Sequence, residues 1–114
     1  MNTFLVLYLT PTSVLDDWIN TPEEERKAME EKVQSDWAAW MEKHGSSVKE
    51  TRGASKTKLV TADGVADTRN DVMMFSLVEA ESPEAAAKMF EGHPHLSIPE
   101  SSIEIMTANS LPGM

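Results

Sequence analysis

The stretch that decides the fold is DVMMFSLVEA, residues 71–80, together with the run Phe4-Leu5-Val6-Leu7-Tyr8-Leu9 near the N-terminus. Both stretches are almost continuously apolar. A strand with apolar side chains on both faces is typical of the centre of a sheet, where both faces are covered. The two stretches therefore predict the central strands of one sheet.

A long helix is predicted between these strands. The segment Thr21-Pro22-Glu23-Glu24 places Thr at the N-cap, Pro at the first helical position and Glu at the third, which is a capping box. Gly45 is a suitable stop, so the helix can extend to Lys43. At helical spacing one stripe of its surface carries the side chains that we expect to be buried, which are Met29, Val33, Trp37, Trp40 and His44.

The remaining segments complete the order of strands and helices. Residues 48–51 and 57–61 are short polar strand candidates typical of a sheet edge, and Asp63-Gly64 predicts a turn. Ser82-Pro83 predicts the start of a second helix, and residues 102–107 alternate as a last strand. This order predicts an α+β, ferredoxin-like βαββαβ fold. We expect a four-stranded antiparallel sheet, a possible extra hairpin, and two helices on one face.

The length of 114 residues predicts a single domain, residues 1–114. Two helices cover one face of a four-stranded sheet. The other face would still carry apolar side chains from both central strands, and a soluble monomer rarely leaves such a patch in water. We therefore expect a second copy to cover it, sheet against sheet, in a homodimer.

Composition excludes several classes of protein. The net charge of −9 argues against a surface for nucleic acid or for an anionic membrane, both of which need a basic face. The absence of cysteine excludes disulfides, thiolate metal sites and cysteine nucleophiles. The N-terminal apolar run is too short for a signal peptide or a membrane span, so we expect a cytoplasmic protein.

Short motifs spread over nearly the whole chain resemble a known family in their order and spacing. They are Phe4-Leu5-Val6-Leu7-Tyr8, Trp40-Met41-Glu42-Lys43-His44-Gly45, Val78-Glu79-Ala80, His93-Pro94-His95-Leu96, Ser102-Ile103-Glu104-Ile105 and Pro112-Gly113-Met114. With them the chain resembles the YCII-related (DGPF-type) family of the dimeric α/β-barrel superfamily.

The loop that names this family is changed here. Asp63-Gly64 is followed by Val65-Ala66 in place of Pro-Phe, and Asp67-Thr68-Arg69 is similar to the acid–Thr–base that often follows the loop. The resemblance implies a ferredoxin-like protomer, a homodimer joined through its sheets, and a cleft in each protomer. It implies no particular reaction.

The histidines are candidate functional residues. His93 and His95 flank Pro94 just after a predicted helix end, where the helix dipole favours an imidazolium. Either could be a general acid or base at a cleft. The alternative is a rigid connector whose histidines hydrogen-bond to backbone carbonyls. The pair could also bind zinc, with a third ligand from His44, Asp36 or Glu104.

Asp36 lies at the margin of the predicted buried stripe, one turn before Trp40. A carboxylate there needs a partner, and it could orient or charge a histidine from the 93–95 segment. A solvated edge carboxylate is the alternative. His44, in the last helical turn, either caps backbone carbonyls or contacts a ligand.

Three further side chains are candidate ligand contacts. The hydroxyl of Tyr8 could point into the cleft from the first strand, and Trp18, in a predicted loop, could close the cleft or a dimer seam. Arg69 could attract an anionic ligand, with help from a nearby basic patch. A solvated polar edge is the alternative for this patch, which comprises Lys49, Arg52, Lys56 and Lys58.

These observations predict a homodimer that binds a small organic molecule in a cleft between sheet and helices. If the protein is an enzyme, we expect acid–base catalysis without a cofactor, with His93 or His95 carrying the proton, Asp36 orienting it and Tyr8 donating a hydrogen bond. The rival is a non-enzymatic dimeric regulatory or interaction module. Metal or haem binding is a third alternative. The predicted ligand contacts are Tyr8, Trp18, Trp40, His44 and Arg69.

Overall fold

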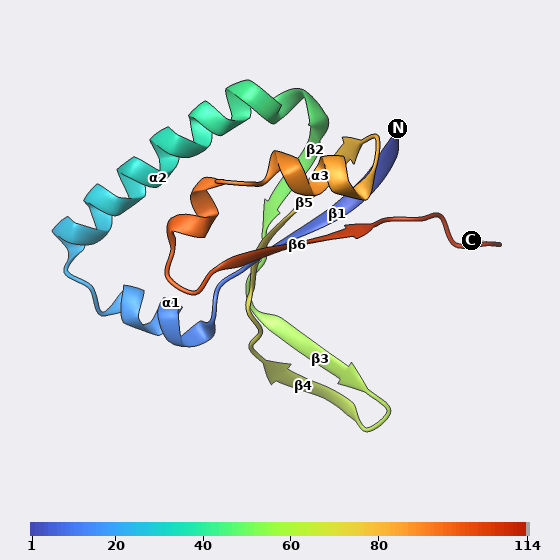
Figure 1. Cartoon of the computed structure of the whole chain (residues 1–114). Coiled ribbons are helices and arrows are strands. Elements are labelled where there is room, and N and C mark those ends of the chain that lie inside the picture. The colour runs from blue at the N-terminus through green and yellow to red at the C-terminus, as the bar shows by residue number, and fades with distance from the viewer. Residues whose placement is uncertain (114) are drawn as a thin grey trace.

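The computed structural model describes residues 1–113. Its main feature is an antiparallel sheet with the strand order β2-β5-β1-β6 (Figure 1). The central pair is β1 and β5, as the two apolar stretches predict. The bounds are Asn2–Leu9 for β1, Val48–Gly53 for β2, Val72–Ala80 for β5 and Ser102–Thr107 for β6.

The path through this sheet is ferredoxin-like. Helix α2, Glu23–His44, connects β1 to β2, and helix α3, Pro83–Met89, connects β5 to β6. Two short 3₁₀ helices follow these helices, η1 (Gly45–Ser47) and η2 (Pro94–Ser97). The chain therefore has the predicted α+β fold, and in sequence order the two helices connect the predicted strands. No helix of residues 1–113 combines the length and apolar character needed to span a bilayer.

The expected extra hairpin is present. Strands β3, Thr57–Thr61, and β4, Gly64–Thr68, pair only with each other and project from the main sheet (Figure 1). Gly64 at the turn has a φ of 127°, a conformation that L-residues with a side chain rarely adopt. The Asp63-Gly64 signal therefore marks the turn correctly.

The core lies between the sheet and the helices. Along β1, Phe4, Val6 and Tyr8 are buried, and the residues between them are only half-buried. This alternation shows that one face of the strand contacts the core. From β5, Ser76, Val78 and Ala80 are buried next to them, and α3 with the residue that follows it adds Ala86 and Phe90.

The opposite face of the sheet also carries large apolar side chains. The register places Leu5 beside Leu77 and Met106, and Leu7 beside Phe75. None of these side chains is fully buried, and Met106 is 40% exposed. This uncovered face, defined by these five residues, is the one that the sequence assigns to a second copy.

One helix was not predicted. Residues Thr12–Ile19 form helix α1, so Trp18 lies on a helix and not in a loop. This helix also removes the predicted capping box. The Thr21 hydroxyl donates to the Asp17 carbonyl at 3.0 Å, and α2 begins at Glu23 without a side-chain cap. Because α1 ends so close to α2, Thr21 binds the end of the first helix instead of the start of the second.

The predicted buried stripe of α2 is correct only in part. Trp40 near its C-terminal end is 8% exposed, whereas Met29 near its N-terminal end is 48% exposed. The N-terminal half of α2 arches away from the sheet (Figure 1). The Cα radius of gyration is 16.1 Å, against about 13 Å expected for a compact chain of this length. The arch and the projecting hairpin account for this open shape.

Capping provides a test of these assignments. The Ser82 hydroxyl accepts a hydrogen bond from the Ala85 backbone N–H at 3.1 Å, so it caps α3 as predicted. Ser82→Ala should lower the free energy of unfolding by about 1 kcal/mol. Thr21→Ala, which removes no N-cap, should cost less than about half of that. Urea denaturation of both variants measures the difference, and the reverse order of effects would contradict the assignment.

Candidate functional site

His93 and His95 lie together at the start of η2, deep in the protein. They are 1% and 0% exposed. The Nδ1 atom of His93 accepts a hydrogen bond from the His95 backbone N–H at 3.0 Å. Pro94 is compatible with this tight turn because it needs no backbone donor at the first helical position. Both imidazoles therefore face inward, and of the two only His95 hydrogen-bonds to a backbone carbonyl, that of Leu9.

His93 is enclosed by aromatic rings. Its ring centroid lies 4.4 Å from that of Trp37, 4.7 Å from Trp40, 5.5 Å from Tyr8 and 5.6 Å from Phe90. We call these five residues the aromatic cluster. Trp37 and Trp40 come from α2, Tyr8 from β1 and Phe90 from the end of α3. The cluster joins the helices to the sheet.

The hydrogen bonds fix neutral tautomers for both histidines. His93 Nδ1 is an acceptor, so the proton of its neutral ring is on Nε2. His95 Nε2 lies 2.9 Å from the Leu9 carbonyl, so it donates and its Nδ1 carries a lone pair. Both remaining atoms, His93 Nε2 and His95 Nδ1, are buried and have no hydrogen-bond partner within residues 1–113. One buried donor and one buried acceptor are thus left unused.

The surroundings also keep both rings uncharged. Burial lowers the pKa of His93 to about 4, and repulsion from His95 and His44 acts in the same direction. Burial lowers the pKa of His95 too, and its hydrogen bond to the Leu9 carbonyl opposes this shift. At neutral pH both rings are therefore uncharged, and of the two only His95, through Nδ1, has a free lone pair that could accept a proton.

Tyr8 uses its hydroxyl within the sheet. The oxygen lies 2.9 Å from Ser76 Oγ, which in turn lies 2.7 Å from Thr51 Oγ1. Burial raises the pKa of Tyr8, and the hydrogen bond with Ser76 opposes part of this shift. This chain of hydroxyls runs across three adjacent strands. The Tyr8 ring, not its hydroxyl, is what contacts the histidines.

His44 lies beside the aromatic cluster, next to Trp40. Trp40 Nε1 donates to the Met89 carbonyl at 3.0 Å, and its ring centroid lies 5.0 Å from that of His44. His44 is half-buried at the end of α2. The structure therefore gathers five of the predicted site residues in one region: Tyr8, Trp40, His44, His93 and His95.

Asp36 lies outside this group. Its side chain is exposed and pairs with Lys32 Nζ at 2.8 Å, one turn earlier on α2. Within residues 1–113, no hydrogen bond or ion pair joins Asp36 to a histidine. The catalytic roles of Asp36, His93 and His95 remain predictions.

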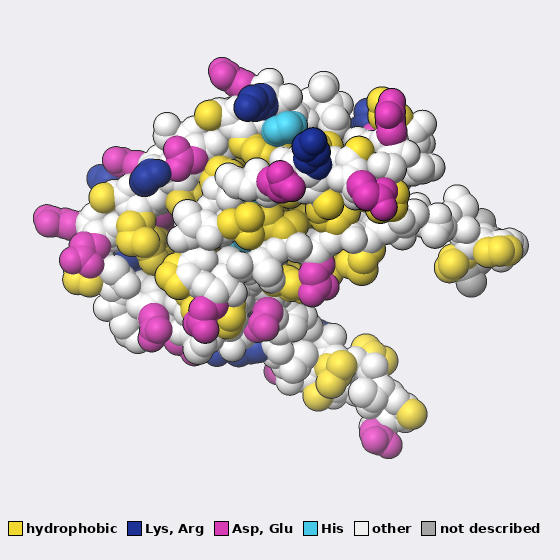
Figure 2. All heavy atoms as spheres, in the orientation of Figure 1, with side chains coloured by type: hydrophobic (Ala, Val, Ile, Leu, Met, Phe, Trp, Pro, Cys, Tyr) yellow, Lys and Arg dark blue, Asp and Glu magenta, His cyan; other side chains and the backbone are white. Residues whose placement is uncertain are grey.

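The larger described cavity is a groove of about 490 Å³ beneath the arch of α2. Of the predicted site residues, only Trp18 lines it. Figure 2 shows hydrophobic side chains gathered in the area that α1, α2 and η2 enclose. The lining is mainly apolar, with three carboxylates and few other polar groups. Its residues are Val14, Leu15, Asp17, Trp18, Thr21, Met29, Glu30, Val33, Gln34, Met73, Ser97, Ile98, Pro99 and Glu100.

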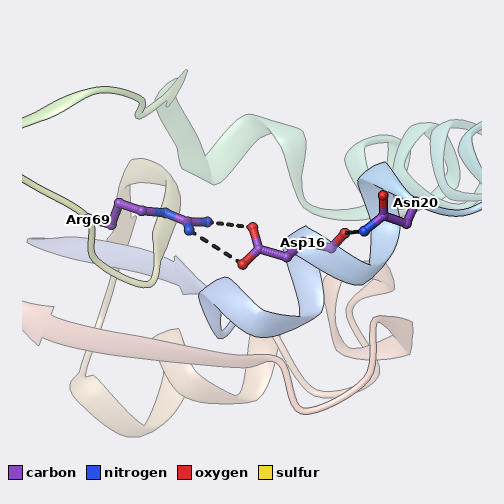
Figure 3. A network of polar contacts seen from close by, with 3 residues as sticks. All are labelled: Asp16, Asn20 and Arg69. Carbon is purple, nitrogen blue, oxygen red and sulfur yellow. Dashed lines mark hydrogen bonds and ion pairs between the residues drawn. The ribbon is translucent and has the colours of Figure 1, made fainter.

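Arg69 lines a second, smaller cavity of about 270 Å³ at the base of the β3–β4 hairpin. Its guanidinium donates to both carboxylate oxygens of Asp16, at 3.0 and 3.4 Å (Figure 3). We call this cavity the hairpin pocket. Its residues are Thr12, Leu15, Ala54, Ser55, Lys56, Thr57, Thr68, Arg69, Asn70, Val72 and Met73.

Sequence reasoning missed most of the groove because it missed α1. Leu15 and Met73 line both cavities. A signal for the helix was present, since Val14, Leu15 and Trp18 have the spacing of one helical face. The N-cap position of this helix is Pro11, whose side chain forms no capping hydrogen bond, so the sequence carries no start signal for it.

The histidines do not form a metal centre in the part of the chain described. No three His, Asp or Glu side chains of residues 1–113 come together around a common point. The register places Glu104 beside Leu7, on the sheet face opposite His93.

Comparison with known proteins gives a limited result. No protein-family model matches the chain, and no curated protein matches it at a significant level. A search of solved structures finds a 5-chloro-2-hydroxyhydroquinone dehydrochlorinase from Burkholderia phenoliruptrix AC1100, in complex with 2,5-dihydroxybenzoquinone. The identity is 15%, the match covers 91% of each chain, and the TM-score is 0.47. A likeness at this level carries no inference about function.

The buried histidines predict a pH-dependent stability. The pKa of His93 is about 4 in the folded protein, below the ordinary value of 6.5. The unfolded chain therefore binds the proton first, and stability is lost as the pH falls from 6.5 toward 4. Between about pH 8 and pH 5, His93 should lower the free energy of unfolding by about 2 kcal/mol. Urea denaturation at both pH values should show a smaller loss for His93→Gln, and an equal loss would contradict the assignment.

Proposed function

We propose that the protein is a homodimer that binds a small, mainly apolar organic molecule in the groove of each protomer. The observation that carries this proposal is the groove itself. Its volume of about 490 Å³ falls within the usual range for small-molecule sites. Its walls are mostly aliphatic and aromatic side chains, which favour an apolar ligand through burial of that ligand's surface.

The position of the groove supports binding over a purely structural gap. Its walls come from α1, from the N-terminal half of α2 and from the segment after η2. The aromatic cluster packs the other half of α2 against the sheet, so the groove lies beneath the half of the helix that has no such contact. A ligand would therefore occupy space that the fold keeps open.

The shape of the chain supports the dimer. The molecule measures 51 × 45 × 19 Å, so one dimension is much shorter than the other two, as expected for a single sheet with helices on one face. The uncovered face of the sheet presents Leu5, Leu7, Phe75, Leu77 and Met106. Stacking two such faces would remove them from water. This is the arrangement that membership in the YCII-related family, which we propose on the sequence motifs, implies.

Acid–base catalysis without a cofactor is a second candidate function. The observation in its favour is the unused donor on His93 Nε2 and the unused acceptor on His95 Nδ1. Neither histidine lines the groove or the hairpin pocket, so a ligand would reach these atoms only if the buried histidine segment opened. In this version His95 acts as the base through Nδ1, His93 Nε2–H donates a hydrogen bond, and Asp36 would have to leave Lys32 to assist. A regulatory module would bind the same ligand and release it unchanged.

Light scattering after size exclusion tests the dimer. The wild-type protein should have twice the protomer mass of 12.6 kDa. Leu7→Asp places a carboxylate at the centre of the uncovered face, beside Glu104, and should give the mass of one protomer. Ile19→Asp is the control, because Ile19 is an exposed apolar residue on α1. A wild-type mass of 12.6 kDa would overturn the dimer.

An NMR titration with 4-phenyl-1-butanol tests the groove. Amide signals of groove residues should shift in the wild-type protein. Val33→Trp fills part of the groove and should weaken binding roughly tenfold. Ala39→Trp is the matched control, since it adds the same side chain at an exposed position of the same helix. Equal affinity in the two variants, or shifts confined to other surfaces, would contradict the proposal.

A further inference from the structure

The hairpin pocket and the groove are neighbours. Leu15 of α1 and Met73 of β5 line both cavities. The side chains of these two residues therefore lie between the two cavities. A molecule in the groove could place one end in the hairpin pocket by passing these two flexible apolar residues.

The two cavities have opposite charge. Asp17, Glu30 and Glu100 are the charged residues that line the groove. The charged residues that line the hairpin pocket are Lys56 and Arg69. Since the chain as a whole has a net charge of −9, this local pair of cations differs from its surroundings.

The hairpin pocket also offers neutral donors. Asn70 Oδ1 accepts from the Val72 backbone N–H at 2.9 Å, which leaves its amide N–H groups available. Thr12, Thr57 and Thr68 also line the pocket, and the Thr68 hydroxyl donates to the Arg69 carbonyl at 3.5 Å. Hydroxyls, an amide, an ammonium and a guanidinium are the groups that recognise carboxylate or phosphate oxygens.

Lys56 and Arg69 differ in how free they are to bind an anionic ligand. Lys56 forms no ion pair within residues 1–113. Arg69 is held by Asp16, whose backbone carbonyl also accepts from Asn20 at 3.0 Å (Figure 3). Asp16 therefore orients the guanidinium and also competes with any incoming anion.

Backbone strain marks both cavities. Among residues 1–113, the non-glycine residues with a left-handed backbone are Lys56, with φ 37°, and Glu100, with φ 59°. Such residues carry a conformational cost and tend to occur at functional sites. One of them lines the hairpin pocket and the other lines the groove.

We propose that the hairpin pocket is an oxyanion subsite and that the ligand of the groove is an organic anion. Its apolar body lies in the groove and its carboxylate or phosphate group contacts Lys56 and Arg69. The groove carboxylates repel the anionic end, so they fix the direction in which the ligand enters. This inference rests on the proposed groove and adds the chemical class of its ligand.

Two probes with the same carbon skeleton, one ending in a carboxylate and the other in a neutral hydroxyl, test the subsite. NMR titrations would compare 4-phenylbutyrate with 4-phenyl-1-butanol, which have the same phenyl chain. The butyrate should bind about fivefold or more tightly than the alcohol, because it alone can use the two cations. Its titration should shift amide signals in both cavities.

Variants of charged residues locate the effect. Lys56→Gln and Arg69→Gln should each weaken 4-phenylbutyrate about threefold to fivefold and leave the alcohol unchanged. Asp16→Asn should strengthen 4-phenylbutyrate, because the internal competitor is removed. Lys58→Gln is the control, since Lys58 pairs with Asp67 on the hairpin and does not line the pocket.

The outcomes separate the two proposals. If both probes bind the groove with equal affinity in all variants, the oxyanion subsite is wrong and the groove stands. If neither probe binds, the groove proposal fails and the subsite assignment fails with it. If 4-phenylbutyrate binds more tightly but loses nothing in Lys56→Gln and Arg69→Gln, the anion is bound elsewhere and the assignment is overturned.

Discussion

The structure depends on the packing of the aromatic cluster between sheet and helices. Tyr8, Trp37, Trp40, Phe90 and His93 come from β1, α2 and the segment around the end of α3, and they are in mutual contact. Large aromatic side chains contribute more buried apolar surface than any others. Because the cluster lies at the C-terminal end of α2, it holds only this end firmly against the sheet.

The open N-terminal half of α2 follows from that asymmetry. Its first turns carry Glu23, Glu24 and Glu25, which favour the helix terminus but bring no apolar surface to the sheet. With α1 beneath it and the segment after η2 beside it, the half-exposed Met29 and Val33 border a groove instead of a packed core. The distribution of apolar residues along one helix thus decides where space for a ligand exists.

The sheet could be predicted from the sequence and the site only in part. Residues 71–80 and 4–9 carry so many apolar side chains that only central positions suit them, and β1 and β5 occupy those positions. Helix α1 escaped prediction because a proline precedes it and its apolar face is short. Because α1 was not predicted, Trp18 was placed in a loop and Thr21 was assigned to the start of α2. The groove that α1 lines was not predicted either.

The contacts of buried site residues could be predicted better than those of exposed ones. His93, His95, Tyr8, Trp40 and His44 are drawn together by burial, which apolar and aromatic patterning can indicate. Asp36 and Arg69 are exposed, and they pair with Lys32 and Asp16. One partner is four residues away on the same helix and the other is more than fifty residues away. Composition and periodicity carry little information about a pair as distant in sequence as Arg69 and Asp16.

The register of β1 changes between Tyr8 and Leu9, where the pairing with β5 is irregular. The Leu9 carbonyl lies at this irregularity and receives the His95 Nε2–H. A slip of β1 by one residue would present a different carbonyl to His95 and would turn Tyr8 away from the core. The hydrogen bond from the buried imidazole therefore stabilises the native register of β1. Registers shifted by one residue would lose this bond.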